Sequence, residues 1–172
     1  MKLVECIRAD LLAEGRSGGL AAFAKAFLFS PGFKTVFICR LARWFCAMGR
    51  LGRVTSRLLW LHNVRRSGCH ISPLANIGSG LYLPHSTGIV IGEGAVIGNG
   101  VTIYQNVTVG VGRSVCGRSG YPTIGDQATI YSNAVVFGAI IVGNRARVGA
   151  GEVLNRSIDD EATVKAGIIA HR

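Results

Sequence analysis

The sequence has few charges, few acids, and no cysteine spacing of the kind that binds metals. Only 16% of its 172 residues are charged, and 19 Lys and Arg outnumber 9 Asp and Glu, for a formal net charge of +10. The cysteines are five in number and include no CxxC pair (Cys6, Cys39, Cys46, Cys69 and Cys116). An odd set without metal-like spacing favours free thiols in a reducing compartment, so we expect no metal site and a cytoplasmic location.

Long apolar runs are also missing. No stretch of about 20 apolar residues exists, so no single membrane-spanning helix is expected. The N-terminus carries Glu5 and Asp10 and lacks a short apolar core, so no signal peptide is expected either. The 24 glycines are not accompanied by the Pro, Ser and Gln typical of disorder, and they therefore indicate tight turns.

The positive charge is concentrated in the first part of the chain. Residues 1–70 hold 12 Lys and Arg against 3 acids, whereas residues 71–172 hold 7 against 6. A basic surface can attract nucleic acid, anionic lipid or an acidic partner. No nucleic-acid recognition motif accompanies it, so nucleic-acid binding is not expected.

An aliphatic residue recurs every six positions through the second part of the chain. The series is Ile71, Ile77, Leu83, Ile91, Ile97, Ile103, Val109, Ile124, Ile130, Val136, Val142, Val148 and Leu154. Gly often follows the aliphatic residue, and a small or apolar residue usually stands four positions after it. Ordinary half-buried strands in a sandwich would show a period of two without this six-residue spacing.

Six residues suffice for one short strand and one tight corner, and three such units close a triangular coil of about 18 residues. The aliphatic side chain then points into the coil, and Gly or Asn serves the corner. We therefore predict a mainly β fold over residues 69–172, a left-handed parallel β-helix of hexapeptide repeats. Its winding would be an exception to the right-handed crossover rule.

Residues 1–68 form a helical N-terminal extension in this interpretation. Leu3, Ile7 and Leu11 share one helical face, a second helix covers 20–29, and a long amphipathic segment covers 33–66, with Gly49 and Gly52 dividing it. One reading is a cap that packs on the first coil or on other subunits, with its arginines in solvent. The other is peripheral contact with the inner face of an anionic membrane.

The repeat is interrupted twice, and a rigid solenoid carries function where it is interrupted. Two extra residues fall between Leu83 and Ile91, around His85. Nine extra residues fall between Val109 and Ile124, in a Gly-rich basic loop. The loop leaves from the corner after that of His85, so the two would meet most easily between neighbouring subunits, which suggests a homotrimer.

The segment from His85 to Glu93 (HSTGIVIGE), the segment VTIYQNVTVG that ends at Gly110, and YPTIGD from Tyr121 resemble the core of serine acetyltransferases. The wider group includes exopolysaccharide and antibiotic O-acetyltransferases of the hexapeptide class. The resemblance covers roughly residues 69–170. It implies acetyl-CoA as co-substrate, a hydroxyl acceptor, and no metal or covalent intermediate.

The resemblance implies that His85 is the general base that takes the acceptor's proton, and a neutral imidazole suits that role. A structural corner histidine is the alternative. The partner Asp of the family corresponds to His70, the Asp before the catalytic His to Pro84, and the second His to Tyr121. Glu93 is our candidate for orienting His85, and Tyr121 could donate a hydrogen bond to the acceptor or oxyanion.

The family's acetyl-CoA groove lies between coils of adjacent subunits. The matching positions are Gly110, Gly112, Tyr131, Ser132 and Ala150, with Arg147 placed to meet CoA phosphates. For each of these, plain repeat geometry or a solvated charge is the alternative. Cys116 could in principle carry an acyl group, but an incidental position in the loop is the favoured interpretation.

We therefore expect an acetyl-CoA-dependent O-acetyltransferase of the serine acetyltransferase type. The alternatives are acetylation of a sugar in an exopolysaccharide or lipid-linked precursor, and an inactive assembly scaffold. The short helical part and the chain ending Ala170-His171-Arg172 suggest that cysteine synthase is not a partner.

Overall fold

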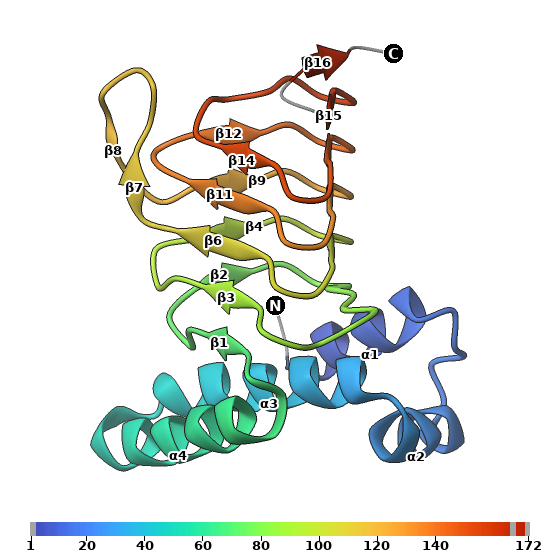
Figure 1. Ribbon diagram of the computed structural model, residues 1–172. Coiled ribbons are helices and arrows are strands. Elements are labelled where there is room, and N and C mark those ends of the chain that lie inside the picture. The colour runs from blue at the N-terminus through green and yellow to red at the C-terminus, as the bar shows by residue number, and fades with distance from the viewer. Residues whose placement is uncertain (1–2, 166–167, 171–172) are drawn as a thin grey trace.

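The computed structural model describes residues 3–165 and 168–170, and it combines a group of helices with stacked short strands (Figure 1). The helices are α1 (Leu3–Ala13), α2 (Leu20–Phe29), α3 (Pro31–Cys46) and α4 (Gly49–Ser67). They lie together at one end of the strands, and the first strand begins at His70. The prediction of a helical N-terminal part followed by a mainly β part is confirmed. Residues 1–2, 166–167 and 171–172, including His171 and Arg172 at the predicted end, lie outside the described residues.

Local sequence accounts for the ends of the helices. Ser30 caps α3, because its Oγ accepts a hydrogen bond from the Phe33 N–H at 3.2 Å, and Pro31 follows at the first helical position. Gly68 ends α4 in the left-handed conformation. The predicted long segment divides before Gly49, whereas Gly52 lies inside α4, where a side chain would collide with the Phe45 carbonyl.

Within the described residues, thirteen short strands build the coil and pair in parallel in three sheets. The first sheet has the order β1-β3-β6-β11-β14, the second β2-β4-β9-β12, and the third β5-β10-β13-β15. β16 (Ile168–Ala170) adds to the third sheet in antiparallel orientation. The bounds are β1 (His70–Ile71), β2 (Asn76–Ile77), β3 (Val90–Ile91), β4 (Val96–Ile97), β5 (Thr102–Ile103), β6 (Thr108–Gly110), β9 (Thr123–Ile124), β10 (Thr129–Ile130), β11 (Val135–Phe137), β12 (Ile141–Val142), β13 (Arg147–Val148), β14 (Val153–Leu154) and β15 (Thr163–Lys165).

Parallel pairing sets the length of each coil. Ile91 pairs with Val109 eighteen residues later, and Val136 pairs with Leu154 at the same spacing. The two interruptions lengthen their coils, to twenty residues from Ile71 to Ile91 and to twenty-seven from Val109 to Val136. Beyond Leu154 the last coil is two residues shorter, because Val148 pairs with Val164. The predicted series stopped at Leu154, since this deletion breaks the six-residue spacing.

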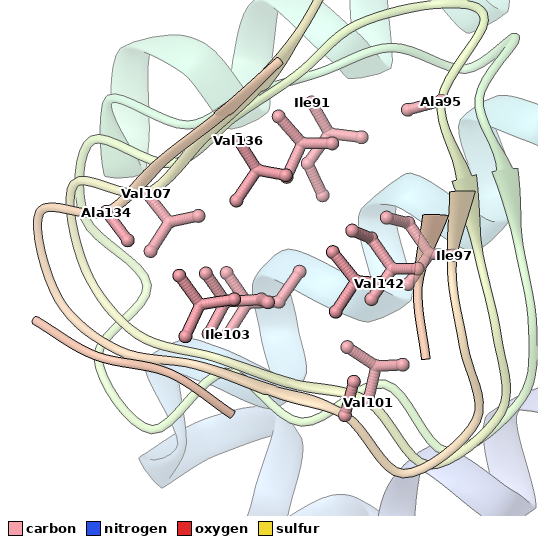
Figure 2. Packing of buried hydrophobic residues seen from close by; sticks show 14 of the residues in the cluster. Ile91, Ala95, Ile97, Val101, Ile103, Val107, Ala134, Val136 and Val142 are labelled. Atoms are coloured by element: carbon pink, nitrogen blue, oxygen red, sulfur yellow. The ribbon is translucent and has the colours of Figure 1, made fainter. Parts of the chain in front are cut away.

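The interior of the coil is filled by columns of aliphatic side chains (Figure 2). Twelve of the thirteen predicted aliphatic residues are buried, and Ile77, next to the helices, is partly buried. Small residues such as Ala95 and Ala134 occupy the tighter places beside the corners. Every coil thus places side chains of similar size over those of the coil below, which keeps the stack in register.

Backbone hydrogen bonds and left-handed residues form the corners. In one column of corners, Gly88, Asn106, Asn133 and Gly151 all have positive φ values. Asn106 N–H donates to the Thr87 carbonyl at 2.9 Å, and Asn133 N–H donates to the Gln105 carbonyl at 3.0 Å. Asn tolerates this conformation better than most side chains, which explains its recurrence here.

A buried ion pair fastens the helices to the first coil. Arg40 of α3 donates to both carboxylate oxygens of Asp10 in α1 at 2.9 Å, and to the carbonyls of Ile77 at 2.8 Å and Gly78 at 2.5 Å. The Leu81 N–H donates to Asp10 at 2.9 Å. Arg40 was expected in solvent with its neighbours. It is instead buried. The Ile77 and Gly78 carbonyls are in the first coil, which has no coil beneath it to donate to them, and Arg40 supplies the missing donors.

Candidate active site

His85 stands at an interrupted corner of the first coil, beside the helices. Its side chain is exposed, and the following Ser86 is buried. The segment from Pro84 to Thr87 lines an open depression of about 530 Å³ together with Pro31, Arg66, Ser67 and Gly68. Gly32 lets α3 come close here, since a side chain at that position would collide with the Leu83 carbonyl. The helices therefore form one wall of the space next to the imidazole.

A ladder of aromatic rings rises from His85 along the same column of corners. The His85 and Tyr104 ring centroids lie 6.3 Å apart, and Tyr104 and Tyr131 stack at 5.3 Å with an interplanar angle of 21°. Tyr131 borders a second open depression of about 570 Å³, whose other walls include Arg147, Gly149, Ala150 and Lys165. Ser132 is next to it in the corner, where its carbonyl accepts from the Gly151 N–H at 2.9 Å.

Four of the six predicted cofactor residues thus gather above His85. Tyr131, Ser132 and Ala150 belong to the corners of that column, and Arg147 lies on the strand that leads into it. The groove is lined by two cations, Arg147 and Lys165, by one carboxylate, Glu152, and by the small residues Gly149 and Ala150. Cations beside exposed backbone can hold a flexible chain that ends in phosphates.

The other candidates lie at a different corner. Tyr121 packs its ring over the turn at Gly92 and Gly94, which flank Glu93, and side chains at these glycines would collide with the ring. Gly110 pairs with Phe137, and a side chain at Gly112 would collide with the Phe137 ring. The basic loop leaves from this corner as a hairpin of β7 (Gly112–Arg113) and β8 (Ser119–Gly120), which projects from the side of the coil (Figure 1).

The structure does not bring Glu93 to His85 within one chain. Glu93 lines a third depression, of about 300 Å³, with Arg57, Trp60 and His70, whereas His85 lines another. The strand β3 separates the two corners, and no hydrogen bond joins the two side chains among the residues described. Glu93 therefore stays a prediction that requires a neighbouring copy of the chain.

Two buried polar atoms near His85 lack partners. Ser86 Oγ and Gln105 Oε1 are both buried, and neither makes a hydrogen bond within residues 3–165 and 168–170. Buried polar groups are nearly always paired, so these two atoms are exceptions within a single copy of the described chain. Sequence reasoning did not single out these residues or Tyr104. The six-residue spacing places Tyr104 and Gln105 in the coil next to His85 and Ser86, and this alignment could have identified them.

No group of three or more His, Cys, Asp or Glu side chains able to hold a metal gathers in the described part of the chain.

No protein-family model matches the sequence. Individual proteins do match. The serine acetyltransferase of Mycobacterium tuberculosis is 34% identical over 163 residues, which span 94% of this chain and 70% of the relative. The chain belongs to the serine acetyltransferase family.

Other members of the serine acetyltransferase family agree with this assignment. The enzyme of Buchnera aphidicola is 45% identical over 140 residues, covering 80% of this chain and 52% of the relative. The crystal structure of the Vibrio cholerae serine acetyltransferase superimposes with a TM-score of 0.83 at 30% identity, covering 98% of this chain and 64% of that one. The chain thus spans roughly half to two thirds of the length of most of these relatives.

The structure also places the residues that depart from the serine acetyltransferase motif. His70 replaces the expected Asp on β1, and its ring lies edge-on to Trp60 at a centroid distance of 5.7 Å. Pro84 is partly buried beside His85, and Tyr121 is partly buried over the neighbouring corner. The depression around His85 therefore contains Arg66 and no carboxylate among its described walls.

Proposed function

We propose that this protein transfers the acetyl group of acetyl-CoA to a hydroxyl acceptor, with His85 as general base. The observation that carries the proposal is an exposed imidazole at an interrupted corner of a serine acetyltransferase chain, joined through the Tyr104 ring to Tyr131 at the edge of a groove that contains Arg147 and Lys165. The acceptor would enter beside the helices, and the thioester would reach His85 along the corner column.

In the proposed reaction, the His85 imidazole accepts the proton of the acceptor hydroxyl while the oxygen attacks the thioester carbonyl. The tetrahedral intermediate collapses, the carbon–sulfur bond breaks, and the imidazolium returns the proton to the CoA sulfur. The products are an O-acetyl ester and free CoA. Every proton and electron pair is accounted for without a metal or a covalent enzyme intermediate.

The groove bordered by Tyr131 supports the placement of CoA. Gly149 and Ala150 leave room for a pantetheine arm to approach the backbone, and Arg147 is placed to pair with a phosphate. Gly110 and Gly112 lie at the other corner, so they would contact CoA held against a neighbouring subunit.

A homotrimer unites the two corners in this proposal. One subunit contributes His85 and the groove, and the next contributes Tyr121, Glu93 and the hairpin. Such an interface would also supply partners to Ser86 Oγ and Gln105 Oε1, which are buried and unpaired in the described part of one chain. We also propose that the coil winds with a left hand.

A sugar hydroxyl is the second candidate acceptor, and the site gives a specific reason. The ammonium group of an amino acid needs a carboxylate partner when it is desolvated. His70 and Pro84 stand where the family motif implies acids, and Arg66 borders the depression. L-serine would therefore depend on Glu93 of another subunit for its ammonium group, whereas a neutral sugar would not. Since acetyl-CoA would be the donor, we also propose a cytoplasmic location.

Release of free CoA, measured with L-serine and with a panel of sugars, tests the proposal. His85→Ala should lower kcat by about 100-fold or more with the active acceptor, as expected for loss of a general base. His62→Ala is the matched control, because His62 is exposed on α4, and it should keep full activity. Turnover that survives His85→Ala at the wild-type rate contradicts the catalytic role. Absence of turnover with every acceptor favours the inactive scaffold.

A further inference from the structure

The outer face of α4 is apolar although nothing in the described chain covers it. Leu51, Val54 and Leu58 are spaced by three and four residues, so they form one stripe. Their exposed fractions are 86%, 59% and 61%. We call these three residues the α4 stripe. Single exposed leucines are common in proteins, but three in line on one helix face indicate a partner.

The stripe points away from the rest of the molecule. The buried residues of α4 are Gly52, Ser56 and Asn63, which lie on nearly the opposite side of the helix. Trp60, on the flank, contacts His70 of the first strand. The helix thus uses its other faces for α3 and the coil. It lies across the end of the coil where the first strand begins (Figure 1).

Basic side chains accompany the stripe, and acidic ones are missing. Arg50, Arg53, Arg57 and Arg65 are all exposed on α4. No Asp or Glu occurs between Glu14 and Glu93, so α2, α3 and α4 contain no acid, although Glu93 of the coil lines a depression together with Arg53 and Arg57. Two copies that met through this face would bring Arg50 and Arg65 against the same arginines of the other copy, and α4 has no acid of its own to offset them. The charge therefore argues against a second copy as the occupant.

An anionic lipid surface fits both features. An amphipathic helix with aliphatic residues on one face and arginines beside them lies in the plane of a membrane interface, with its apolar residues among the acyl chains. Long arginine stems allow their guanidinium groups to reach the headgroups. The helix does not need to cross the bilayer. Among the described residues no single helix is long and apolar enough to do so, and only the pair α2–α3, bent by 106°, passes on length and composition.

We propose that α4 docks this protein on anionic membranes through the α4 stripe and its flanking arginines. This property is independent of acetyl transfer. Docking through α4 would hold the end of the coil that the helices cover near a lipid surface. The depression next to His85 lies at that end, and a lipid-linked acceptor would be found there.

Co-sedimentation of the full chain with vesicles tests the proposal. We expect binding to vesicles of equal parts phosphatidylglycerol and phosphatidylcholine at low salt, and little binding to pure phosphatidylcholine. The Arg50→Gln/Arg65→Gln variant should bind roughly thirtyfold more weakly, since each basic residue near an anionic surface strengthens binding by about fivefold. Arg145→Gln, an exposed arginine on the coil, is the matched control and should bind like the wild type.

The Leu51→Asn/Leu58→Asn variant separates membrane docking from simple charge attraction. It should lose vesicle binding while retaining binding to heparin, a polyanion without acyl chains. The control is Ile141→Asn, since Ile141 is 60% exposed on the coil. Far-UV circular dichroism verifies that both variants fold. Undiminished vesicle binding by the leucine variant overturns the proposal. So does light scattering that shows the wild type, but not this variant, in a larger assembly, because the stripe would then be an interface between copies.

Discussion

Replacing Asp10 by Asn should detach the helices from the first coil. The substitution keeps the shape of the side chain and removes its charge, so Arg40 would keep two backbone carbonyls and lose its counter-ion. Although burial by itself lowers the pKa of Arg40, the hydrogen bond and charge of Asp10 raise it above its ordinary value. Without Asp10, the cost of burying the guanidinium is no longer offset.

The expected cost is large for a single substitution. Removing one partner of a buried ion pair destabilises a protein by about 3–5 kcal/mol. If helices and coil unfold together, the melting temperature of a chain of this size falls by roughly 10 °C. If they unfold separately, as stacked repeats can, the helices detach first while the upper coils remain folded.

Two measurements distinguish these outcomes. Thermal unfolding followed by circular dichroism reports the overall loss. Hydrogen exchange of the Leu81 amide, which donates to Asp10, reports local detachment. Glu161→Gln is the control, because its ion pair with Arg145 is exposed, and it should melt like the wild type. If Asp10→Asn melts like the wild type and Leu81 stays protected, the pair does not hold the helices in place.

Two further predictions concern the groove and a thiol. Arg147→Gln should raise the KM for acetyl-CoA by about tenfold at unchanged kcat, because a charge-assisted contact to phosphate is lost in both ground and transition states; steady-state kinetics with varied acetyl-CoA measures this, and an unchanged KM contradicts the assignment. Burial raises the pKa of the Cys39 thiol from 9.0 to about 12. Its contribution to stability is therefore complete below pH 9 and falls by about 1.4 kcal/mol per pH unit above it, because the unfolded thiol ionises first. Urea unfolding at rising pH should show this slope in the wild type and a smaller one in Cys39→Ala.

The sequence predicts the coil well because its core is periodic. Each aliphatic residue lies over its equivalent in the coil below. The spacing of Ile91, Val109 and Val136 along the chain therefore predicts which residues are in contact between coils. The predicted β-helix extends to residue 172, but the aliphatic series that supports it ended at Leu154 for the same reason. The last coil lacks two residues, and a fixed spacing cannot follow Val148 to Val164 across that deletion.

Contacts between the helices and the coil were not predictable in this way. Arg40 looks like its neighbours in the amphipathic segment, and only the three-dimensional structure places it over the Ile77 and Gly78 carbonyls with Asp10 beside it. The arrangement of the His85, Tyr104 and Tyr131 rings was likewise not predictable from the sequence. The register could have aligned these residues, but their stacking depends on side-chain directions that a repeat does not specify.

The division of labour between core and corners explains how the motif can change while the fold persists. The columns inside the coil depend on size alone, and none of the departing residues His70, Pro84 and Tyr121 belongs to them. A substitution at a corner alters the lining of a depression and leaves the pairing of the strands unchanged. A chain of this family can therefore lose the acids that would hold an ammonium group and still present His85 and the groove bordered by Tyr131. Under the proposed function, the acceptor can therefore differ from that of the relatives while the pairing of the strands stays the same.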